Sequence, residues 1–227
     1  MLATLLAFLF STSILGQEKN ILILAGPITG HGKNTHEYEK SAVLIKHLLD
    51  CSDSTDANVT VVFDGWPDTQ SPDGQNLLDS ADTIVMISDG GDHNETNHPL
   101  YVGDRFKQLE KQMNRGCGFV QLHWSTFNPS RFHDNITEWV GGYFDYEKGD
   151  QKNVANKWYS AIKHYTEPIE LGEPDHPISR GVKPFRLLEE FYYRIRFREK
   201  DSRLKKIVMS QPTGEKNQFA VGWAVER

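Results

Sequence analysis

Residues 21–37 have the sequence ILILAGPITGHGKNTHE, and this stretch decides the fold. Its apolar run, Ile21 to Ala25, has the length of a buried strand, and Gly26-Pro27 ends it. A glycine-rich loop follows, and it carries two histidines and a glutamate: His31, His36 and Glu37. The loop after the first strand of an open α/β sheet lies at the carboxyl edge, where such folds bind ligands. The stretch therefore predicts both an α/β fold and one wall of a site.

Strand patterns alternate with helical or connecting segments along the first half of the chain. After the first strand, apolar runs predict strands over residues 59–63, 83–87 and 118–122. The spacing of apolar residues predicts helices over 38–49 and 101–114. Strands separated in this way indicate a doubly wound, mostly parallel α/β sheet flanked by helices.

The second half is less regular. Residues 136–144 predict a short helix that runs into a glycine turn, and a weak alternation over 158–165 predicts a strand. A turn-rich segment spans 175–182. The last strands are expected over 207–210 and 219–224.

Composition limits the classes of function. A length of 227 residues suits a single α/β domain, which we place at residues 20–227. The net charge of −6 and the pI near 5.8 argue against a nucleic-acid-binding protein, which would usually carry a basic face. The mean hydropathy of −0.54 is typical of a soluble globular protein. No apolar run after residue 16 is long enough to cross a bilayer, so we expect no membrane span in the mature chain.

The first sixteen residues, MLATLLAFLFSTSILG, differ from the rest of the chain. They are apolar and end in small and polar residues, which is typical of the apolar core of a secretory signal peptide. We therefore predict a signal peptide at residues 1–16 and a periplasmic or secreted protein; a short membrane anchor or a disordered start is the alternative. In an exported protein, Cys51 and Cys117 could form one disulfide or stay separate thiols.

Ionisable side chains recur where the predicted strands end. Asp89 follows the third strand and His123 follows the fourth. The carboxyl ends of parallel strands lie side by side, so these residues and the histidine loop should converge. Histidines and carboxylates gathered there suit general acid–base work on a polar substrate. They suit a divalent metal equally well, and the candidate ligands are His31, His36, Glu37 and His123.

The loop residues also have purely structural interpretations. His31 would be merely exposed on its glycine loop, and His36 with Glu37 would simply begin a helix. Asp89, which precedes Gly90-Gly91, would only shape a turn.

Three residues farther along the chain are weighed in the same way. Glu190 lies beside a dense aromatic run, where it would either serve a site or balance Arg194 or Arg196. His93 and His98 lie in a polar loop, and we expect both at the surface.

Several common catalytic motifs are absent from the sequence. The fourth strand leads into Leu122-His123-Trp124-Ser125, with no Gly-x-Ser-x-Gly or Gly-x-Cys-x-Gly nucleophile elbow. Gly26 and Gly30 do not form the dinucleotide-binding pattern, and no phosphate-binding P-loop occurs. Nucleophilic acyl transfer and nucleotide chemistry are therefore disfavoured.

Five motifs, taken in order, resemble the trehalose-utilisation (ThuA-like) family over nearly all of residues 20–227. They are His31-Gly32-x-x-x-His36-Glu37, Asp89-Gly90-Gly91, Leu122-His123-Trp124, Asp175-His176-Pro177-Ile178-Ser179-Arg180-Gly181 and Glu189-Glu190-Phe191-Tyr192-Tyr193. The family is similar in fold to class I glutamine amidotransferases, a flavodoxin-like layered α/β domain, but lacks their catalytic cysteine. The resemblance therefore implies a flavodoxin-like fold, which agrees with the missing elbow.

The resemblance also implies carbohydrate metabolism, because some members are linked to oxidised (3-keto) trehalose or related glycosides. On that basis we expect an exported enzyme that acts on a (3-keto-)glycoside by isomerisation or cleavage. We predict His123 and Glu190 as its catalytic acid–base pair. The aromatic members of the substrate-binding set would present flat faces to a sugar ring. The predicted substrate-binding set is His31, His36, Glu37, Asp89, Trp124 and Tyr192.

Two alternatives stay open: a non-catalytic carbohydrate-binding or scaffold module, and a metal-dependent hydrolase. The expected partners are a small carbohydrate and further copies of the chain in a homo-oligomer. The family pattern usually continues past a Trp-Ala-x-Glu-Arg segment into a glycine-rich strand and a further histidine. Because the sequence here ends at Trp223-Ala224-Val225-Glu226-Arg227, we expect a fragment of a longer protein.

Overall fold

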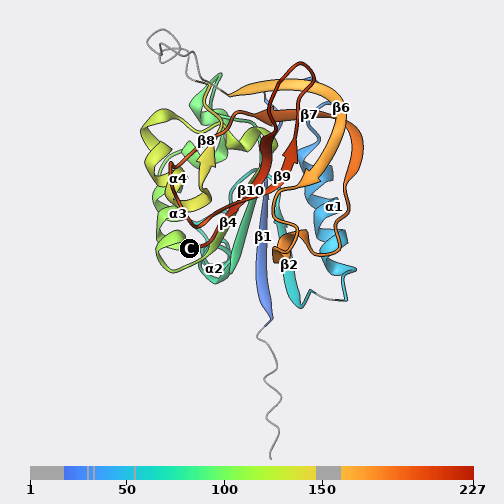
Figure 1. Ribbon diagram of the computed structural model, residues 1–227. Coiled ribbons are helices and arrows are strands. Elements are labelled where there is room, and N and C mark those ends of the chain that lie inside the picture. Colours follow the sequence, from blue (N-terminus) through green and yellow to red (C-terminus); the bar gives the residue numbers. More distant parts are fainter. Residues whose placement is uncertain (1–17, 30, 33, 54, 147–159) are drawn as a thin grey trace, which may run out of the picture.

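A parallel sheet forms the first half of the chain (Figure 1). The computed structural model describes residues 18–29, 31–32, 34–53, 55–146 and 160–227, so the predicted signal peptide lies outside the described residues. The sheet has the strand order β2-β1-β3-β4, and every neighbouring pair is parallel. Its strands are β1 (Lys19–Ala25), β2 (Ala57–Val62), β3 (Thr83–Ile87) and β4 (Gly118–Leu122). The four strands predicted from apolar runs are confirmed.

Helices cover both faces of this sheet, as a doubly wound arrangement requires. Alternate residues of β1 point to opposite faces, so Leu22 and Leu24 enter one core while Ile23 and Ala25 enter the other. The helix α1 (Tyr38–Asp50) covers the second of these cores, and Figure 1 shows it alone on its side of the sheet. The opposite face is covered by α2 (Pro72–Ser80), α3 (Arg105–Asn114) and α4 (His133–Val140).

The helix predicted from residue 101 begins four residues later, at Arg105. Pro99–Tyr101 forms a separate 3-10 turn, and Gly103 has a φ of +60°, which breaks the helical path between the two. The short helix expected in 136–144 is confirmed as α4, and Gly141 ends it at a φ of +82°.

The second half builds a separate antiparallel sheet with the strand order β10-β9-β6-β7. Its strands are β6 (Ala161–Leu171), β7 (Phe185–Tyr193), β9 (Leu204–Ser210) and β10 (Phe219–Val225). Our prediction of one mostly parallel sheet therefore holds for the first half only. The strand expected over 158–165 begins at Ala161 among the described residues and continues to Leu171. Its polar residues alternate with the buried Tyr165 and Ile169, which is typical of an antiparallel strand covered on one face.

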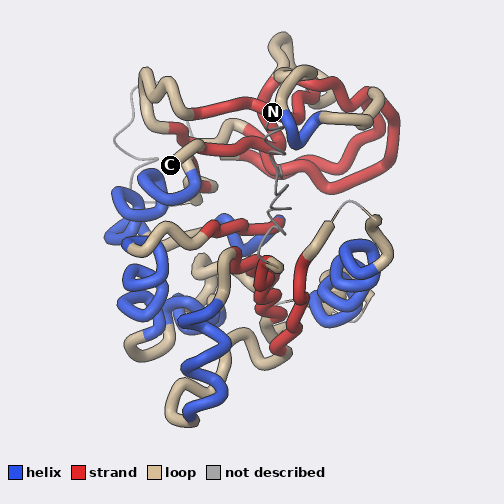
Figure 2. The backbone as a smooth tube through the Cα atoms, turned by 90° about the horizontal axis from the view of Figure 1, so that it is seen from below, coloured by secondary structure: helices blue, strands red, loops and turns tan. Residues whose placement is uncertain are grey.

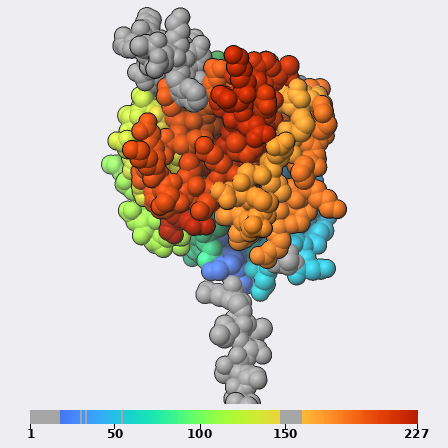
Figure 3. All heavy atoms as spheres, in the orientation of Figure 1, coloured from blue at the N-terminus to red at the C-terminus, as the bar shows by residue number. Residues whose placement is uncertain are grey.

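The antiparallel sheet lies along one side of the parallel half, where Figure 2 shows it as a layer of its own; in Figure 3 its orange and red atoms cover much of the face turned to the viewer. A short antiparallel ribbon joins the two halves. It pairs β5 (Gly142–Tyr143), which follows α4, with β8 (Arg196–Phe197), which follows β7.

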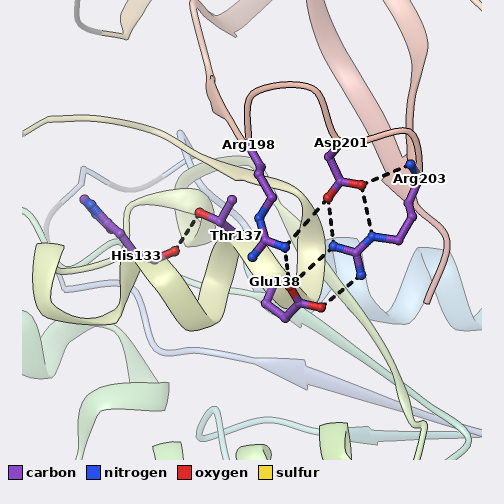
Figure 4. Close-up of polar contacts among 6 residues, drawn as sticks. All are labelled: His133, Thr137, Glu138, Arg198, Asp201 and Arg203. Carbon is purple, nitrogen blue, oxygen red and sulfur yellow. Dashed lines mark hydrogen bonds and ion pairs between the residues drawn. The ribbon is translucent and has the colours of Figure 1, made fainter.

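Ion pairs fasten the second half to α4 (Figure 4). Glu138 of α4 accepts hydrogen bonds from Arg198 and Arg203, the latter at 2.9 Å from Nη1 to Oε1. Asp201 accepts from Arg203 at 2.7 Å, and this contact lowers the pKa of the Asp201 carboxyl to about 2. The network joins the turn between β8 and β9 to α4 of the parallel half.

Cys51 is exposed, Cys117 is buried, and both are free thiols. Among the described residues, no helix combines the length and the apolar character needed to traverse a bilayer.

Candidate active site

Three side chains predicted for the site meet at one point. His36 Nε2 lies 3.0 Å from His123 Nε2, and His123 Nε2 lies 3.1 Å from Glu190 Oε2. The third separation, from His36 Nε2 to Glu190 Oε2, is 3.8 Å. All three side chains are largely enclosed, with exposed fractions of 10% for His36, 30% for His123 and 22% for Glu190. We call this group the His36–His123–Glu190 cluster.

Each member of the cluster comes from a different element. His36 lies in the loop that leads from β1 into α1, and His123 begins the 3-10 turn His123–Thr126 directly after β4. Glu190 comes from β7 of the antiparallel sheet, opposite His164 of β6. The cluster is therefore assembled from both halves of the chain.

His123 has a φ of +55°, a region that residues other than glycine rarely adopt. The turn around it is held by its own side chains, because Thr126 Oγ1 donates to the His123 carbonyl at 2.7 Å. Ser125 Oγ donates to the carbonyl of Leu122 at 2.8 Å and to that of Met86 at 3.1 Å. These bonds tie the turn to β3 and fix the direction in which the His123 ring leaves the sheet.

Aromatic rings surround the cluster. His31 contacts the edge of His36, with ring centroids 3.9 Å apart, and contacts Trp124 at 4.0 Å. Tyr192 stacks on His123 with centroids 4.3 Å apart and an interplanar angle of 14°. Trp124 is itself 3% exposed, and its indole N–H donates to Asp92 Oδ1 at 2.9 Å. The structure thus brings His31, Trp124 and Tyr192 to the cluster, although Trp124 offers little surface to a ligand.

Asp89 lies behind the site. It has no exposed surface, and Tyr38 donates to its Oδ1 at 2.6 Å. Thr29 donates to its Oδ2 twice, from the backbone N–H at 2.7 Å and from Oγ1 at 2.5 Å. Asp89 therefore ties the loop after β1 to the start of α1, and a fully buried carboxylate reaches a ligand only if this packing opens.

Glu37 lies directly before α1 and lines the same cavity as the cluster, but its carboxylate is held by other partners. Its Oε2 pairs with Lys40 at 2.9 Å, and its Oε1 accepts from the backbone N–H of Asn34 at 3.0 Å. Among the described residues, the group that could hold a metal consists of His36, His123 and Glu190, so it includes neither Glu37 nor His31. Of the predicted ligands, His36 and His123 are brought together, and Glu190 takes the place expected of Glu37.

Burial controls the charge of the cluster. Desolvation lowers the pKa of His36 below its ordinary 6.5, His31 lowers it further, and the charge of Glu190 partly opposes both. Desolvation likewise lowers the pKa of His123, with His36 adding to the effect and Glu190 opposing it. Burial raises the pKa of the Tyr192 hydroxyl, and the charge of Glu190 raises it further. Both histidines are therefore held in the neutral form that can accept a proton or bind a metal.

A cavity of about 930 Å³ adjoins the cluster and lies between the two sheets. All three cluster residues line it, together with apolar residues of β4 and β10 that include Phe119, Leu122, Trp223 and Val225. A space of this size and character suits a small-molecule ligand with one polar end at the cluster.

Comparison with known proteins bears on the fold. No protein-family model and no curated protein matches the sequence. A solved structure described as a ThuA-like protein from Bacteroides uniformis matches with a TM-score of 0.56 and 15% identity, covering 92% of this chain and 77% of that one. A second, from Parabacteroides merdae, has a TM-score of 0.51 and 16% identity, covering 85% and 68%. The chain has a ThuA-like fold.

This ThuA-like fold also contains histidines whose positions we predicted wrongly or overlooked. His98, expected at the surface, is fully buried; its Nε2–H donates to the Ser125 carbonyl at 2.9 Å. The signal was present in Pro99-Leu100-Tyr101, an apolar triplet directly after it. His93 is exposed, as expected. His164, which we did not single out, lies 3.5 Å from Glu190 Oε1, and only the strand register reveals it.

Proposed function

We propose that this chain is a carbohydrate-processing enzyme whose reaction centre is the His36–His123–Glu190 cluster. The observation that carries the proposal is the approach of His123 Nε2 to within 3.1 Å of Glu190 Oε2, beside a cavity. A neutral imidazole against a carboxylate is suited to moving a proton to or from a polar substrate. His123 and Glu190 are accordingly the acid–base pair of the proposal.

The substrate proposed is a (3-keto-)glycoside, such as a trehalose derivative, and it rests on the five sequence motifs. A proton taken from the carbon beside a carbonyl leads to isomerisation or to elimination and cleavage, both of which an acid–base pair can promote. His31 and Tyr192 would contact the sugar, since both have exposed surface next to the cluster. We further propose a periplasmic or secreted location, from residues 1–16, and a sheet related to the flavodoxin-like one of class I glutamine amidotransferases.

Turnover of a 3-keto-glycoside by the purified full chain tests the proposal. General acid–base groups contribute about 10²–10⁴-fold, so His123→Asn and Glu190→Gln should each lower kcat by about 100-fold or more. His47→Gln is the matched control, because His47 is an exposed residue in the last turn of α1. Full activity in both site variants would rule out the acid–base pair. Sugar binding by an unaltered chain that turns nothing over would support a binding module instead.

A further inference from the structure

We propose that the His36–His123–Glu190 cluster binds one divalent transition-metal ion of the zinc class. The proposal rests on the cluster of the proposed function but not on its substrate. With an ion bound, His123 and Glu190 would hold the ion instead of acting as a free acid–base pair, and the Lewis acidity of the ion would serve the reaction. Its ligand atoms would be His36 Nε2, His123 Nε2 and Glu190 Oε2, which all lie within 4.8 Å of one another.

The separations between the three atoms fit a tetrahedral ion. Zinc–nitrogen and zinc–oxygen bonds are about 2.0–2.2 Å long, so two ligands of a tetrahedral zinc lie about 3.4 Å apart. The observed separations are 3.0 and 3.1 Å for the two pairs that include His123, and 3.8 Å for the third. Two are slightly shorter than the ideal and one slightly longer. Movements of a few tenths of an ångström would bring all three atoms to bonding distance from a shared ion.

Hydrogen bonding accounts poorly for the same convergence. His123 Nε2 has two close neighbours, His36 Nε2 and Glu190 Oε2. A single N–H on that nitrogen can point at only one of them, so His123 Nε2 donates no hydrogen bond in the other close approach. A shared cation satisfies all three atoms at once.

Two histidines and one glutamate form a ligand set of catalytic zinc sites, in which the fourth position stays open to water or substrate. The open side here is the cavity, which the three residues line on one side. The 30% exposure of His123 and the 22% exposure of Glu190 provide access for an ion.

The surroundings keep the ligand atoms directed at one another. The His36 ring is enclosed by His31 at 3.9 Å and stacks on Tyr38 at 5.7 Å, while Tyr192 stacks on His123. His164 lies 3.5 Å from the other carboxylate oxygen of Glu190, so Oε2 is the one that faces the histidines. Rings fixed by packing lose little freedom when a metal binds. A bound ion would supply Lewis acidity and lower the pKa of a water at the open position.

Zinc binding to the full chain, first stripped with a chelator, tests the proposal by calorimetry. One Zn²⁺ should bind per chain, and Co²⁺ in its place should give the visible absorption of a tetrahedral site. His36→Ala and Glu190→Gln should each weaken Zn²⁺ affinity by about 100-fold or more, since even residues outside the ligand shell commonly contribute about 10–100-fold. Glu190→Gln keeps the size of the side chain and guards against loss of folding, which circular dichroism checks. His47→Gln should bind as the unaltered chain does.

Failure to bind Zn²⁺ at one ion per chain, or binding that survives both cluster variants, would overturn the metal site. That failure is distinguishable from failure of the proposed function. If the stripped chain still turns over a keto-glycoside but binds no zinc, the proposed function stands and the metal site is wrong. If the chain binds one zinc ion but converts no keto-glycoside, either with or without the ion, the metal site stands and the proposed substrate is wrong.

Discussion

His36 Nε2 and His123 Nε2 lie 3.0 Å apart although 87 positions separate the two residues in the sequence. His36 lies in the loop between β1 and α1, and His123 lies directly after β4. In the sheet, β3 lies between β1 and β4. The contact therefore depends on the complete parallel sheet. It also places His36 where its charge lowers the pKa of His123.

The first prediction concerns the titration of these two rings. Desolvation lowers both pKa values, and a neighbouring histidine adds to each shift, His31 for His36 and His36 for His123, so both rings should titrate below 6.5 and remain neutral at pH 7. Glu190 raises both pKa values, so Glu190→Gln should lower them further. Proton NMR of the ring signals, recorded on metal-free protein across pH, measures this directly. A rise in either pKa on loss of the Glu190 charge would contradict the assignment.

The second prediction concerns acid stability. Burial lowers the pKa of His98 to about 4 from 6.5. Between pH 4 and pH 6.5 the imidazole is therefore protonated in the unfolded chain but neutral in the folded chain. The stabilisation is complete above pH 6.5 and is lost as the pH falls towards 4, by about 3 kcal/mol in the free energy of unfolding. His98→Gln, which keeps a donor for the Ser125 carbonyl, should flatten this part of the profile. Urea unfolding at several pH values measures it, and an unchanged slope would refute the role of His98.

The third prediction concerns the bond between Tyr38 and Asp89. Hydrogen bonds to charged groups contribute about 1.5–3 kcal/mol, so Tyr38→Phe should lower the free energy of unfolding by about that amount. Asp89→Asn should do the same and also weaken the contact with Thr29. A double-mutant cycle, measured by urea unfolding, should show coupling between Tyr38 and Asp89. Simple additivity of the two losses would show that the bond adds nothing.

The fourth prediction tests the packing behind Trp124. A Cβ added at Gly90 would lie 2.6 Å from Phe127 Cβ and 2.7 Å from the Trp124 ring. Gly90→Ala should therefore cost about 1–3 kcal/mol of stability, as overpacking does in a well-packed core. Gly32→Ala is the matched control, because nothing lies within 4 Å of the Cβ it would add. Thermal melts of the two variants should separate clearly, and equal Tm values would argue against a close fit at Gly90.

Apolar runs made the parallel half of the fold predictable. Strands such as β3, with Ile84 to Ile87 all buried, are covered on both faces and leave an unbroken apolar stretch in the sequence. Strands such as β6 bury only alternate residues, and its buried Tyr165 and Ile169 stand among charged neighbours. A pattern of that kind does not identify the neighbouring strands, so the antiparallel sheet could not be derived.

The site divides in the same way. His36 and His123 could be placed together because they follow strands of one parallel sheet. Glu190 was predicted as a partner, yet its distance from them depends on how the second sheet docks, which local sequence does not encode. Asp89 and Glu37 both lie at the expected edge of the sheet, but packing encloses Asp89 behind the site and Glu37 pairs with Lys40.

The origin of the cluster in two separate sheets has a consequence for stability. A ligand that binds both histidines and Glu190 at once links the two halves of the chain, because Glu190 belongs to β7 of the antiparallel sheet and the histidines to the parallel half. A ligand present at roughly 100 times its Kd adds about 2.7 kcal/mol to the folded state. The Tm should consequently rise as the fraction of ligand-bound protein rises, so a thermal melt reports how much of the protein holds a ligand at the cluster.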